Sequence, residues 1–303
     1  MKRFLSVKWI MLFILAMIWG SSFILMKKGL TAFRPDQVAS IRMLVACLAS
    51  FPLAIPRLKN LKFEHAKYMA VVGAVGSGIP AFLFATAQTR ISSYLAGMLN
   101  ALTPVFTLIL GSIFFHSKFT PRQITGVMIG FIGAAGLVLI RSGGGISSDA
   151  GYAALIVIAT CCYGISVNTI KTFLSGQDTL LISAVSLMVV GIPYGTYLFT
   201  TDFVHRLTTL PEARMAFAAL ATLSIFGTAL SNILYFQLVK TAGPLFASAV
   251  TYIMPVIALF WGLADGEVLH PLHLFAMIAI LAGVGLISWK GNTSIKKSTW
   301  NEG

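Results

Sequence analysis

Two apolar stretches of the chain each carry a proline and a row of small or polar residues on one helix face. The first row consists of Ser93, Gly97, Asn100, Pro104, Thr107 and Gly111. The second row, 151 residues later, consists of Pro244, Ser248, Thr251, Pro255, Ala258 and Gly262. Alternating steps of four and three residues place each row on one side of a helix. The hydroxyl and amide groups there could bind a small solute, with Pro104 and Pro255 as helix hinges, or the small residues could only let helices pack closely.

Other polar side chains fall inside apolar stretches of the sequence. With members of the two rows they give the candidate substrate-binding residues Trp19, Ser22, Arg42, Gln88, Asn100, Tyr163, Asn168, Asn232, Tyr235, Thr251 and Tyr252. An amide or hydroxyl buried in hydrocarbon without a partner costs about 2–7 kcal/mol, so these groups must face protein, water or a ligand. The alternative to substrate binding is hydrogen bonding between helices, which contributes about 0.6 kcal/mol per bond in membranes.

Arg42 falls inside the second apolar stretch. A lone arginine at that depth is costly unless it snorkels to the interface or meets a carbonyl group or an anion. Two interpretations follow. Arg42 is either a structural anchor or, with Lys27, Lys28 and Arg34 nearby, part of a basic vestibule that favours carboxylate-bearing substrates.

The other reactive residues form no recognisable catalytic or metal site. The nine acidic residues and five histidines fall in connections, tails or the ends of apolar stretches, so no acid, base or metal group gathers at one depth. Cys47, Cys161 and Cys162 lack the spacing of metal ligands or of a disulfide framework. We therefore expect no catalytic residue, no metal and no cofactor. A membrane-embedded enzyme is the alternative, and an open cavity rather than a metal site would discriminate against it.

The composition identifies an integral membrane protein. Hydrophobic residues make up 57% of the chain and charged residues 10%, and the mean hydropathy is +0.87. A water-soluble globular chain of this size does not normally have such a composition. Windows long enough to cross a bilayer as helices cover residues 9–29, 37–55, 68–88, 92–115, 122–141, 150–170, 179–200, 213–238, 244–263 and 271–289. The first is expected to be a retained transmembrane helix, because its apolar run is too long for a secretory signal.

The net charge of +13 is distributed unevenly between the two sides of these predicted spans. One side receives Lys2, Arg3, Lys8, Arg57, Lys59, Lys62, Lys67, Lys118, Arg122, Lys171, Lys240, Lys290, Lys296 and Lys297. The other side receives Lys27, Lys28, Arg34, Arg90, Arg141, Arg206 and Arg214. This two-to-one bias predicts a multi-pass protein of the cell membrane with both termini in the cytoplasm. The basic charge is therefore a topology signal, and we expect no nucleic-acid partner.

The chain contains an internal repeat. WGSSFILMK, which begins at Trp19, is echoed 144 residues later by YGISVNTIK, which begins at Tyr163, and the stretch from Pro121 is echoed from Pro271. Residues 1–143 are thus predicted to form one repeat of five helices and residues 150–290 a second, with residues 291–303 as a cytoplasmic tail. Because five is odd, the second repeat must enter the membrane from the opposite side. Inverted repeats with a substrate site near the midplane are a common plan of secondary transporters.

The motifs of this repeat resemble those of the EamA-type transporters of the drug/metabolite transporter superfamily. The resemblance rests on WGSSF, on IRMLVA with Arg42, on the prolines of LTPVF and IMPVI, and on the two glycine-rich closing stretches, and it covers nearly the whole chain. It implies ten helices in two inverted bundles, with a central cavity formed by the first four helices of each repeat. It also implies transport of small metabolites, often amino acids or related compounds and commonly outward.

The sequence thus predicts an all-α integral membrane protein of ten transmembrane helices in two inverted five-helix repeats. We expect a secondary transporter that exports small metabolites, amino acids or related compounds among them, across the cytoplasmic membrane by alternating access. A membrane-embedded enzyme, or a non-transporting scaffold or lipid-handling protein, is the alternative. The expected partners are a small-molecule substrate and the lipid bilayer, for a monomer or homodimer. Since no acidic residue lies inside a span, we expect facilitated diffusion or exchange rather than a buried carboxylate proton relay.

The basic cluster of Arg57, Lys59, Lys62 and Lys67 predicts that the connection around Asn60 faces the cytoplasm. In a variant without native cysteines, a cysteine at Asn60 should resist a membrane-impermeant thiol reagent in intact cells and react once the cells are permeabilised. Rapid modification in intact cells would reverse the assigned topology.

Overall fold

The computed structural model of the chain describes residues 2–118, 120–141, 150–264 and 271–288. All regular structure in these ranges is helical, as predicted. The helices, with η denoting π-helical segments, are α1 Lys2–Gly29, α2 Pro35–Leu58, α3 Phe63–Gly73, η1 Ala74–Gly78, α4 Ile79–Ala87, α5 Ser93–Asn100, α6 Thr103–Phe115, α7 Pro121–Arg141, α8 Ala150–Phe173, α9 Thr179–Phe199, α10 Phe203–Thr209, α11 Ala213–Ser224, η2 Ile225–Leu230, α12 Ser231–Ala242, α13 Pro244–Ser248, α14 Val250–Ala264 and α15 Pro271–Ser288.

Seven helical segments in the described ranges are long and apolar enough to cross a membrane. They are Val7–Gly29, Pro35–Leu58, Phe63–Ala87, Leu95–Phe115, Ala150–Phe173, Thr179–Phe199 and Ala213–Ala242. Shorter apolar helices cover Pro244–Met254 and Leu274–Gly283. The chain is therefore a multi-pass membrane protein. The predicted tail at residues 291–303 lies outside the described residues.

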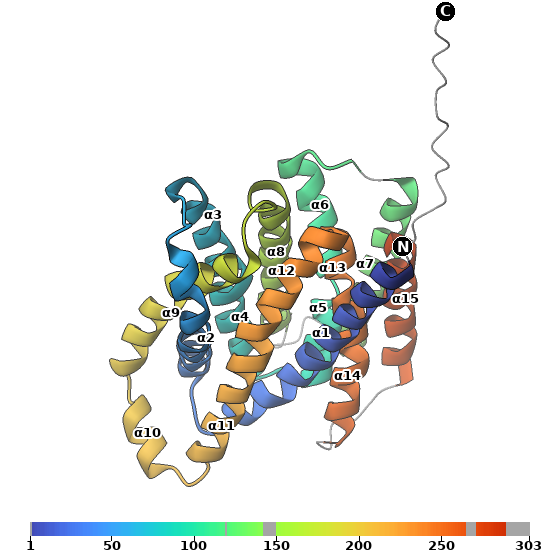
Figure 1. Ribbon diagram of the computed structural model, residues 1–303. Helices are drawn as coiled ribbons and strands as arrows, with labels where there is room; N and C mark the ends of the chain where they lie inside the picture. The colour runs from blue at the N-terminus through green and yellow to red at the C-terminus, as the bar shows by residue number, and fades with distance from the viewer. Residues whose placement is uncertain (1, 119, 142–149, 265–270, 289–303) are drawn as a thin grey trace, which may run out of the picture.

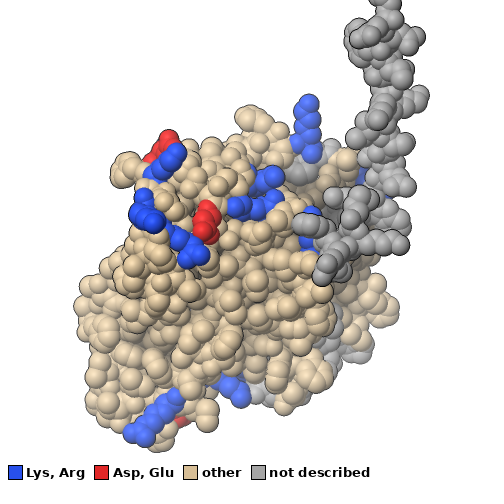
Figure 2. Space-filling view, viewed as in Figure 1, with Lys and Arg blue, Asp and Glu red and all other residues tan. Residues whose placement is uncertain are grey.

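The helices run between two ends of the molecule. α1 begins and α15 ends at the upper end in Figure 1, whereas α10 lies at the lower end. Lys and Arg side chains on the face shown in Figure 2 gather mostly at the upper end, fewer lie at the lower end, and a broad zone between them shows no charge. This zone has the character that a lipid-facing surface requires.

Large apolar side chains on the outer faces of the helices are exposed. Among the most exposed are Phe13, Ile55, Phe131, Ile132, Ile192, Phe260, Phe275 and Ile278. Such a surface would be an aggregation hazard in water, but it is the expected boundary of a protein that is solvated by lipid tails. The buried residues, in contrast, include many Ala, Ser and Thr, the small residues that let membrane helices approach one another.

Corresponding helices of the two repeats pack against each other. α2 packs along α9, and α7 packs along α15. A Cβ atom on Gly191 of α9 would overlap the Cβ atom of Cys47 of α2, and the two positions are 144 residues apart. A Cβ atom on Gly283 of α15 would lie 2.6 Å from the Gly130 nitrogen of α7. Glycine is required at both crossings because it lets the helix backbones approach closely.

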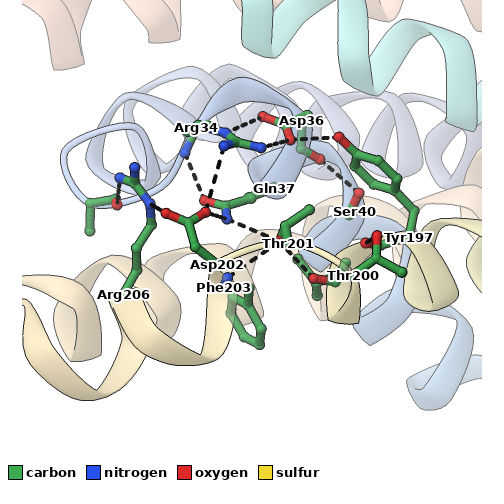
Figure 3. Close-up of polar contacts among 12 residues, drawn as sticks. Arg34, Asp36, Gln37, Ser40, Tyr197, Thr200, Thr201, Asp202, Phe203 and Arg206 are labelled. Atoms are coloured by element: carbon green, nitrogen blue, oxygen red, sulfur yellow. Dashed lines mark hydrogen bonds and ion pairs between the residues drawn. The ribbon is translucent and has the colours of Figure 1, made fainter.

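A polar network ties the α1–α2 connection to the α9–α10 connection (Figure 3). Its centre is Gln37, a fully buried side chain that donates to Asp202 Oδ1 at 2.8 Å and to Thr201 Oγ1 at 3.1 Å. Arg206 Nε donates to the other Asp202 oxygen at 2.7 Å, and Arg34 lies 3.6 Å from the same carboxylate. The hydrogen bond from Arg206 is the main reason that the pKa of Asp202 is below its usual value. The network thus joins the first half of the chain to the second at the lower end.

Gly73 provides a test of the close packing between α3 and α9. A Cβ atom there would overlap the Ser186 carbonyl oxygen, and because this is a backbone atom the helices must separate. We expect Gly73→Ala to lower the free energy of unfolding by about 1–3 kcal/mol. The matched control is Gly151→Ala in α8, where a new Cβ atom meets nothing within 4 Å and should be neutral or slightly stabilising. Equal melting temperatures for the two variants in detergent would contradict this account of the packing.

Candidate functional site

A cavity lies between the first-repeat helices α1, α2, α4 and α5 and the second-repeat helices α8, α12 and α14, together with η1 and η2. Its empty volume is about 820 Å³, part of it open to solvent. It is lined by Trp19, Ser22, Phe23, Met26, Arg42, Gly76, Ser77, Phe84, Asn100, Thr103, Tyr163, Ser166, Val167, Gly227, Thr228, Asn232, Tyr235, Phe236, Thr251 and Met254. A concave lining of mostly apolar side chains with a few polar groups is typical of small-molecule sites.

Most of these lining residues come in pairs that are related by the sequence repeat. At a spacing of 144 residues the pairs are Trp19 with Tyr163, Ser22 with Ser166, and Phe23 with Val167. At a spacing of 151 residues they are Gly76 with Gly227, Ser77 with Thr228, Phe84 with Tyr235, Asn100 with Thr251, and Thr103 with Met254. Both halves of the chain therefore build the wall from equivalent positions.

Aromatic contacts on the wall repeat in the same way. Trp19 of α1 meets Tyr235 of α12 edge to face, with ring centroids 4.9 Å apart. The equivalent residues, Tyr163 of α8 and Phe84 of α4, stack with centroids 6.2 Å apart. These two pairs give the cavity broad apolar surfaces with polar tips.

The two π-helical segments place backbone atoms at the cavity. In η2 the Ser231 amide donates to the carbonyls of Phe226 and Thr228, and the Gly227 carbonyl between them accepts a 2.9 Å bond from Trp19 Nε1. A Cβ atom on Gly227 would lie 2.9 Å from Ser22 Oγ, and one on the equivalent Gly76 of η1 would overlap Ser166 Oγ. Single-turn π segments are frequent at functional sites because they turn backbone groups out of the regular ladder.

The side-chain contacts of the two amides on the wall are long. The Asn100 amide is buried, accepts a 3.3 Å bond from Thr103 Oγ1 and contacts Met254 Sδ at 3.8 Å. Asn232 Nδ2 donates to Ser77 Oγ at 3.3 Å, which is near the limit of a hydrogen bond. Both amides therefore keep capacity for a further partner in the cavity.

Arg42 extends from α2 to the middle of the α11–η2–α12 segment. Its Nε donates to Thr228 Oγ1 at 2.9 Å, and Thr228 lies midway between Ala213 and Ala242. The guanidinium group thus reaches the depth at which a charge is most expensive, about 2.5–3.5 kcal/mol for arginine at a helix centre. Facing a cavity is one of the few ways to relieve that cost.

Eight of the candidate substrate-binding residues line this cavity. They are Trp19, Ser22, Arg42, Asn100, Tyr163, Asn232, Tyr235 and Thr251. Their role in binding stays a prediction. What the structure adds is that residues from six helices and from both halves of the chain meet around one space.

Three other candidates do not line the cavity. Gln88 Nε2 donates to the Phe23 carbonyl at 3.1 Å, and Asn168 Nδ2 donates to the Thr107 and Gly164 carbonyls at 2.9 and 2.8 Å. The bonds to Phe23 and Thr107 join different helices, which is the alternative to substrate binding that the sequence left open, whereas the bond to Gly164 lies within α8. Tyr252 is buried and its hydroxyl has no hydrogen-bond partner among the described residues, but it too lies off the cavity wall.

The two predicted hinge prolines occupy different places in their helices. Pro104 stands in the first turn of α6, directly after a break at residues 101 and 102, and Thr103 Oγ1 donates to the Asn100 carbonyl at 2.8 Å. A proline at position 104 cannot donate to that carbonyl, so the threonine replaces the lost bond. Pro255 lies within α14, and the break in this copy falls earlier, at Ala249. Hinge motion at either proline stays a prediction.

Single-residue signals in the sequence do not reveal the glycines and apolar residues of the wall. Gly76, Ser77, Gly227 and Thr228 were not singled out because helix periodicity does not reveal a π segment. The 151-residue spacing would have found them, because GSG at 76–78 and GTA at 227–229 align at that spacing. Arg42 remains the only charged lining residue in the described ranges, where no three metal-ligating side chains cluster either.

Comparison with known proteins decides the family. Residues 7–139 and 151–289 each match the EamA-like transporter family, so the two matches cover most of the chain. The chain belongs to this family. It is therefore a membrane transporter of small molecules, which confirms the resemblance seen in its motifs.

Similar proteins are also named as transporters. An uncharacterised inner membrane transporter, YedA of Escherichia coli K12, is 28% identical over 290 residues, 91% of this chain and 89% of the relative. A probable terminal-alkyne amino-acid exporter of Streptantibioticus cattleyicolor is 26% identical, with 89% of both chains covered. An S-adenosylmethionine/S-adenosylhomocysteine transporter of Chlamydia muridarum is 24% identical, with 91% of this chain and 90% of the relative covered.

A solved crystal structure has the same fold. It overlays this chain with a TM-score of 0.67 at 13% sequence identity, and the match covers 93% of this chain and 96% of the other. The similarity therefore extends over the whole arrangement of helices.

Proposed function

We propose that this EamA-family member is a secondary transporter that carries its substrate by alternating access around the central cavity. The observation that carries this proposal is the construction of the cavity wall from equivalent positions of the two repeats. A site shared by two equivalent halves can open to either end when one half rocks against the other, which is how repeat transporters work.

The proposed architecture is ten transmembrane helices in two inverted repeats of five. The first repeat comprises α1, α2, α3–η1–α4, α5–α6 and α7, and the second comprises α8, α9, α11–η2–α12, α13–α14 and α15. Because each repeat crosses the membrane five times, an odd number, the second repeat begins on the opposite side of the membrane from the first. The packing of α2 on α9 and of α7 on α15 supports this arrangement, because helices near a two-fold axis meet their own counterparts.

We further propose that both termini are cytoplasmic and that transport runs outward across the cytoplasmic membrane. The connection between α2 and α3, which carries Lys59 and Lys62, lies at the end of the molecule where α1 begins and α15 ends (Figures 1 and 2). The positive-inside rule assigns such an end to the cytoplasm. Export is supported by the relative that is named as an amino-acid exporter.

The substrate is proposed to be a small metabolite, and its transport to be uncoupled from a buried proton relay. Among the described lining residues there is no carboxylate that could take up and release a proton. Asp265 and Glu267, the acidic residues nearest to a span interior in the last repeat, lie outside the described residues. Facilitated diffusion or exchange of substrates is then the simplest mechanism.

The alternatives from other functional classes receive less support. A membrane-embedded enzyme would need acid, base or metal groups at the cavity, whereas the polar side chains of its described wall are amides, hydroxyls, the Trp19 indole and Arg42. A non-transporting scaffold would have no need for a cavity with convergent polar groups that both repeats build.

Asn100 tests the proposed function. Its amide is buried on the cavity wall and has capacity for another partner, so Asn100→Leu should reduce transport in proteoliposomes by roughly tenfold, which corresponds to about 1.4 kcal/mol. Expression and melting temperature should change little. The control is Asn60→Leu, which removes the same amide from an exposed turn and should transport normally.

The transport assay should compare loaded and empty proteoliposomes with a panel of metabolites, so that both exchange and net flux are detected. Wild-type protein with no flux of any panel member above protein-free vesicles would contradict the proposed function. Full transport by Asn100→Leu with an unchanged substrate profile would contradict the role of this wall residue.

A further inference from the structure

The charge of the cavity is carried by one side chain. Among the lining residues that the structure describes, only Arg42 has a formal charge. Its one hydrogen bond is the bond from Nε to Thr228 Oγ1, and no ion pair joins it to a carboxylate of the described chain. The cavity therefore contains a cation for which these parts of the protein supply no counter-charge.

The bond to Thr228 also orients the guanidinium group. With Nε engaged, the two terminal nitrogens remain, with four N–H bonds between them, and the protein offers them no acceptor in the described ranges. The planar pair of terminal nitrogens matches the two oxygens of a carboxylate in a bidentate contact. The arrangement is thus a preset anion fork rather than a flexible surface charge.

The surroundings of the fork are neutral donors and apolar rings. Arg42 and Tyr163 line the same cavity. The hydroxyls of Tyr163 and of the nearby Tyr235 make no hydrogen bond to another described residue, so each can donate to a ligand oxygen. Beyond them, Trp19 and Phe84 provide the apolar walls.

This charge breaks the equivalence of the two repeats. The position 144 residues after Arg42 is Ser186, a fully buried residue whose hydroxyl donates to the Met69 carbonyl at 2.8 Å and does not line the cavity. Among the described lining residues, the first repeat therefore contributes one cationic side chain and the second repeat contributes no matching one. A ligand with a single anionic end and an uncharged remainder fits this asymmetry.

We propose that the cavity binds organic monocarboxylates, with the carboxylate on the Arg42 fork and an aromatic or branched apolar body against Trp19, Phe84 and Tyr235. This inference rests on the proposed transport function and specifies its substrate class. A positive charge on the ligand is unfavourable, because Arg42 repels it and the described wall offers no carboxylate to pair with an ammonium group.

The experiment uses four probes that share one body and differ in charge. They are 3-phenylpropanoate, phenylalanine, 3-phenylpropan-1-ol and 3-phenylpropylamine, each titrated into the purified full chain while the melting temperature is followed. A ligand that binds the folded state raises this temperature by mass action. We expect 3-phenylpropanoate to stabilise the wild-type protein, the alcohol and the zwitterion to act weakly, and the amine to have no effect.

Three variants assign the effect to the fork. Arg42→Gln should weaken the affinity for 3-phenylpropanoate roughly tenfold or more, because the charge-assisted bidentate contact is lost. Arg42→Lys should retain part of the affinity, since it keeps the charge but not the fork. Thr228→Val, which removes only the acceptor that orients Nε, should weaken binding less than Arg42→Gln does. Arg122→Gln, which removes an exposed charge at the start of α7, should change nothing.

Several outcomes would overturn the proposal. These are equal or stronger stabilisation by the amine or by phenylalanine, unchanged binding of 3-phenylpropanoate to Arg42→Gln, and no stabilisation by carboxylates with phenyl, indolyl or branched aliphatic bodies. If Arg42→Gln does not fold, the Arg42→Lys and Thr228→Val titrations decide instead, and unchanged affinity in both would contradict the fork.

Flux measurements separate this inference from the transport function. Carboxylate binding without any uptake into proteoliposomes would contradict transport and leave the anion site intact. Uptake of a cationic or zwitterionic metabolite that persists in Arg42→Gln would contradict the anion site and leave transport intact.

Discussion

A polar group inside a membrane must find its partner within the protein, and this constraint governs the whole structure. Backbone groups are satisfied by helices, and most polar side chains are satisfied by contacts such as those of Asn168 with the carbonyls of Thr107 and Gly164. Some exceptions lie off the cavity, such as the buried Tyr252 hydroxyl, which has no partner among the described residues. Others gather where the helices leave a space. Arg42, Asn100 and the hydroxyls of Tyr163 and Tyr235 keep bonding capacity there, which supports our proposal that the cavity binds a ligand.

The two halves of the chain share this construction, and they differ where recognition needs a difference. The aromatic pairs Trp19–Tyr235 and Phe84–Tyr163 are equivalent, as are the two π-helical segments. Equivalent walls give a site that either half can uncover, which is what alternating access requires. In our proposal the departures from equivalence supply the charge that selects a ligand, above all Arg42, whose equivalent position in the second repeat is Ser186. In our account the symmetric part of the cavity serves motion and the asymmetric part serves specificity.

The sequence predicted the helices well, because long apolar runs leave little choice of structure in a membrane. It could not predict which face of each helix a polar residue would take. Gln88 and Asn100 have the same signal, a lone amide in an apolar run, yet only Asn100 lines the cavity. The π segments at Gly76 and Gly227 could not be predicted for another reason. Glycine has no side chain whose polarity could mark a helix face. A π-helical turn also rotates the side chains that follow it away from the positions expected for a regular α-helix. The break between α13 and α14 at Ala249 falls inside residues 244–263, which the sequence predicts as one continuous span.

The central claim is that one cavity serves both sides of the membrane in turn. A cysteine at Thr228, in a variant whose three native cysteines are replaced, would report on this directly. Its modification by a small charged thiol reagent should be measured in right-side-out and in inverted membrane vesicles. The account predicts modification from both sides, with protection by a bound ligand in each case. Modification from one side only, whatever the ligand, would contradict alternating access.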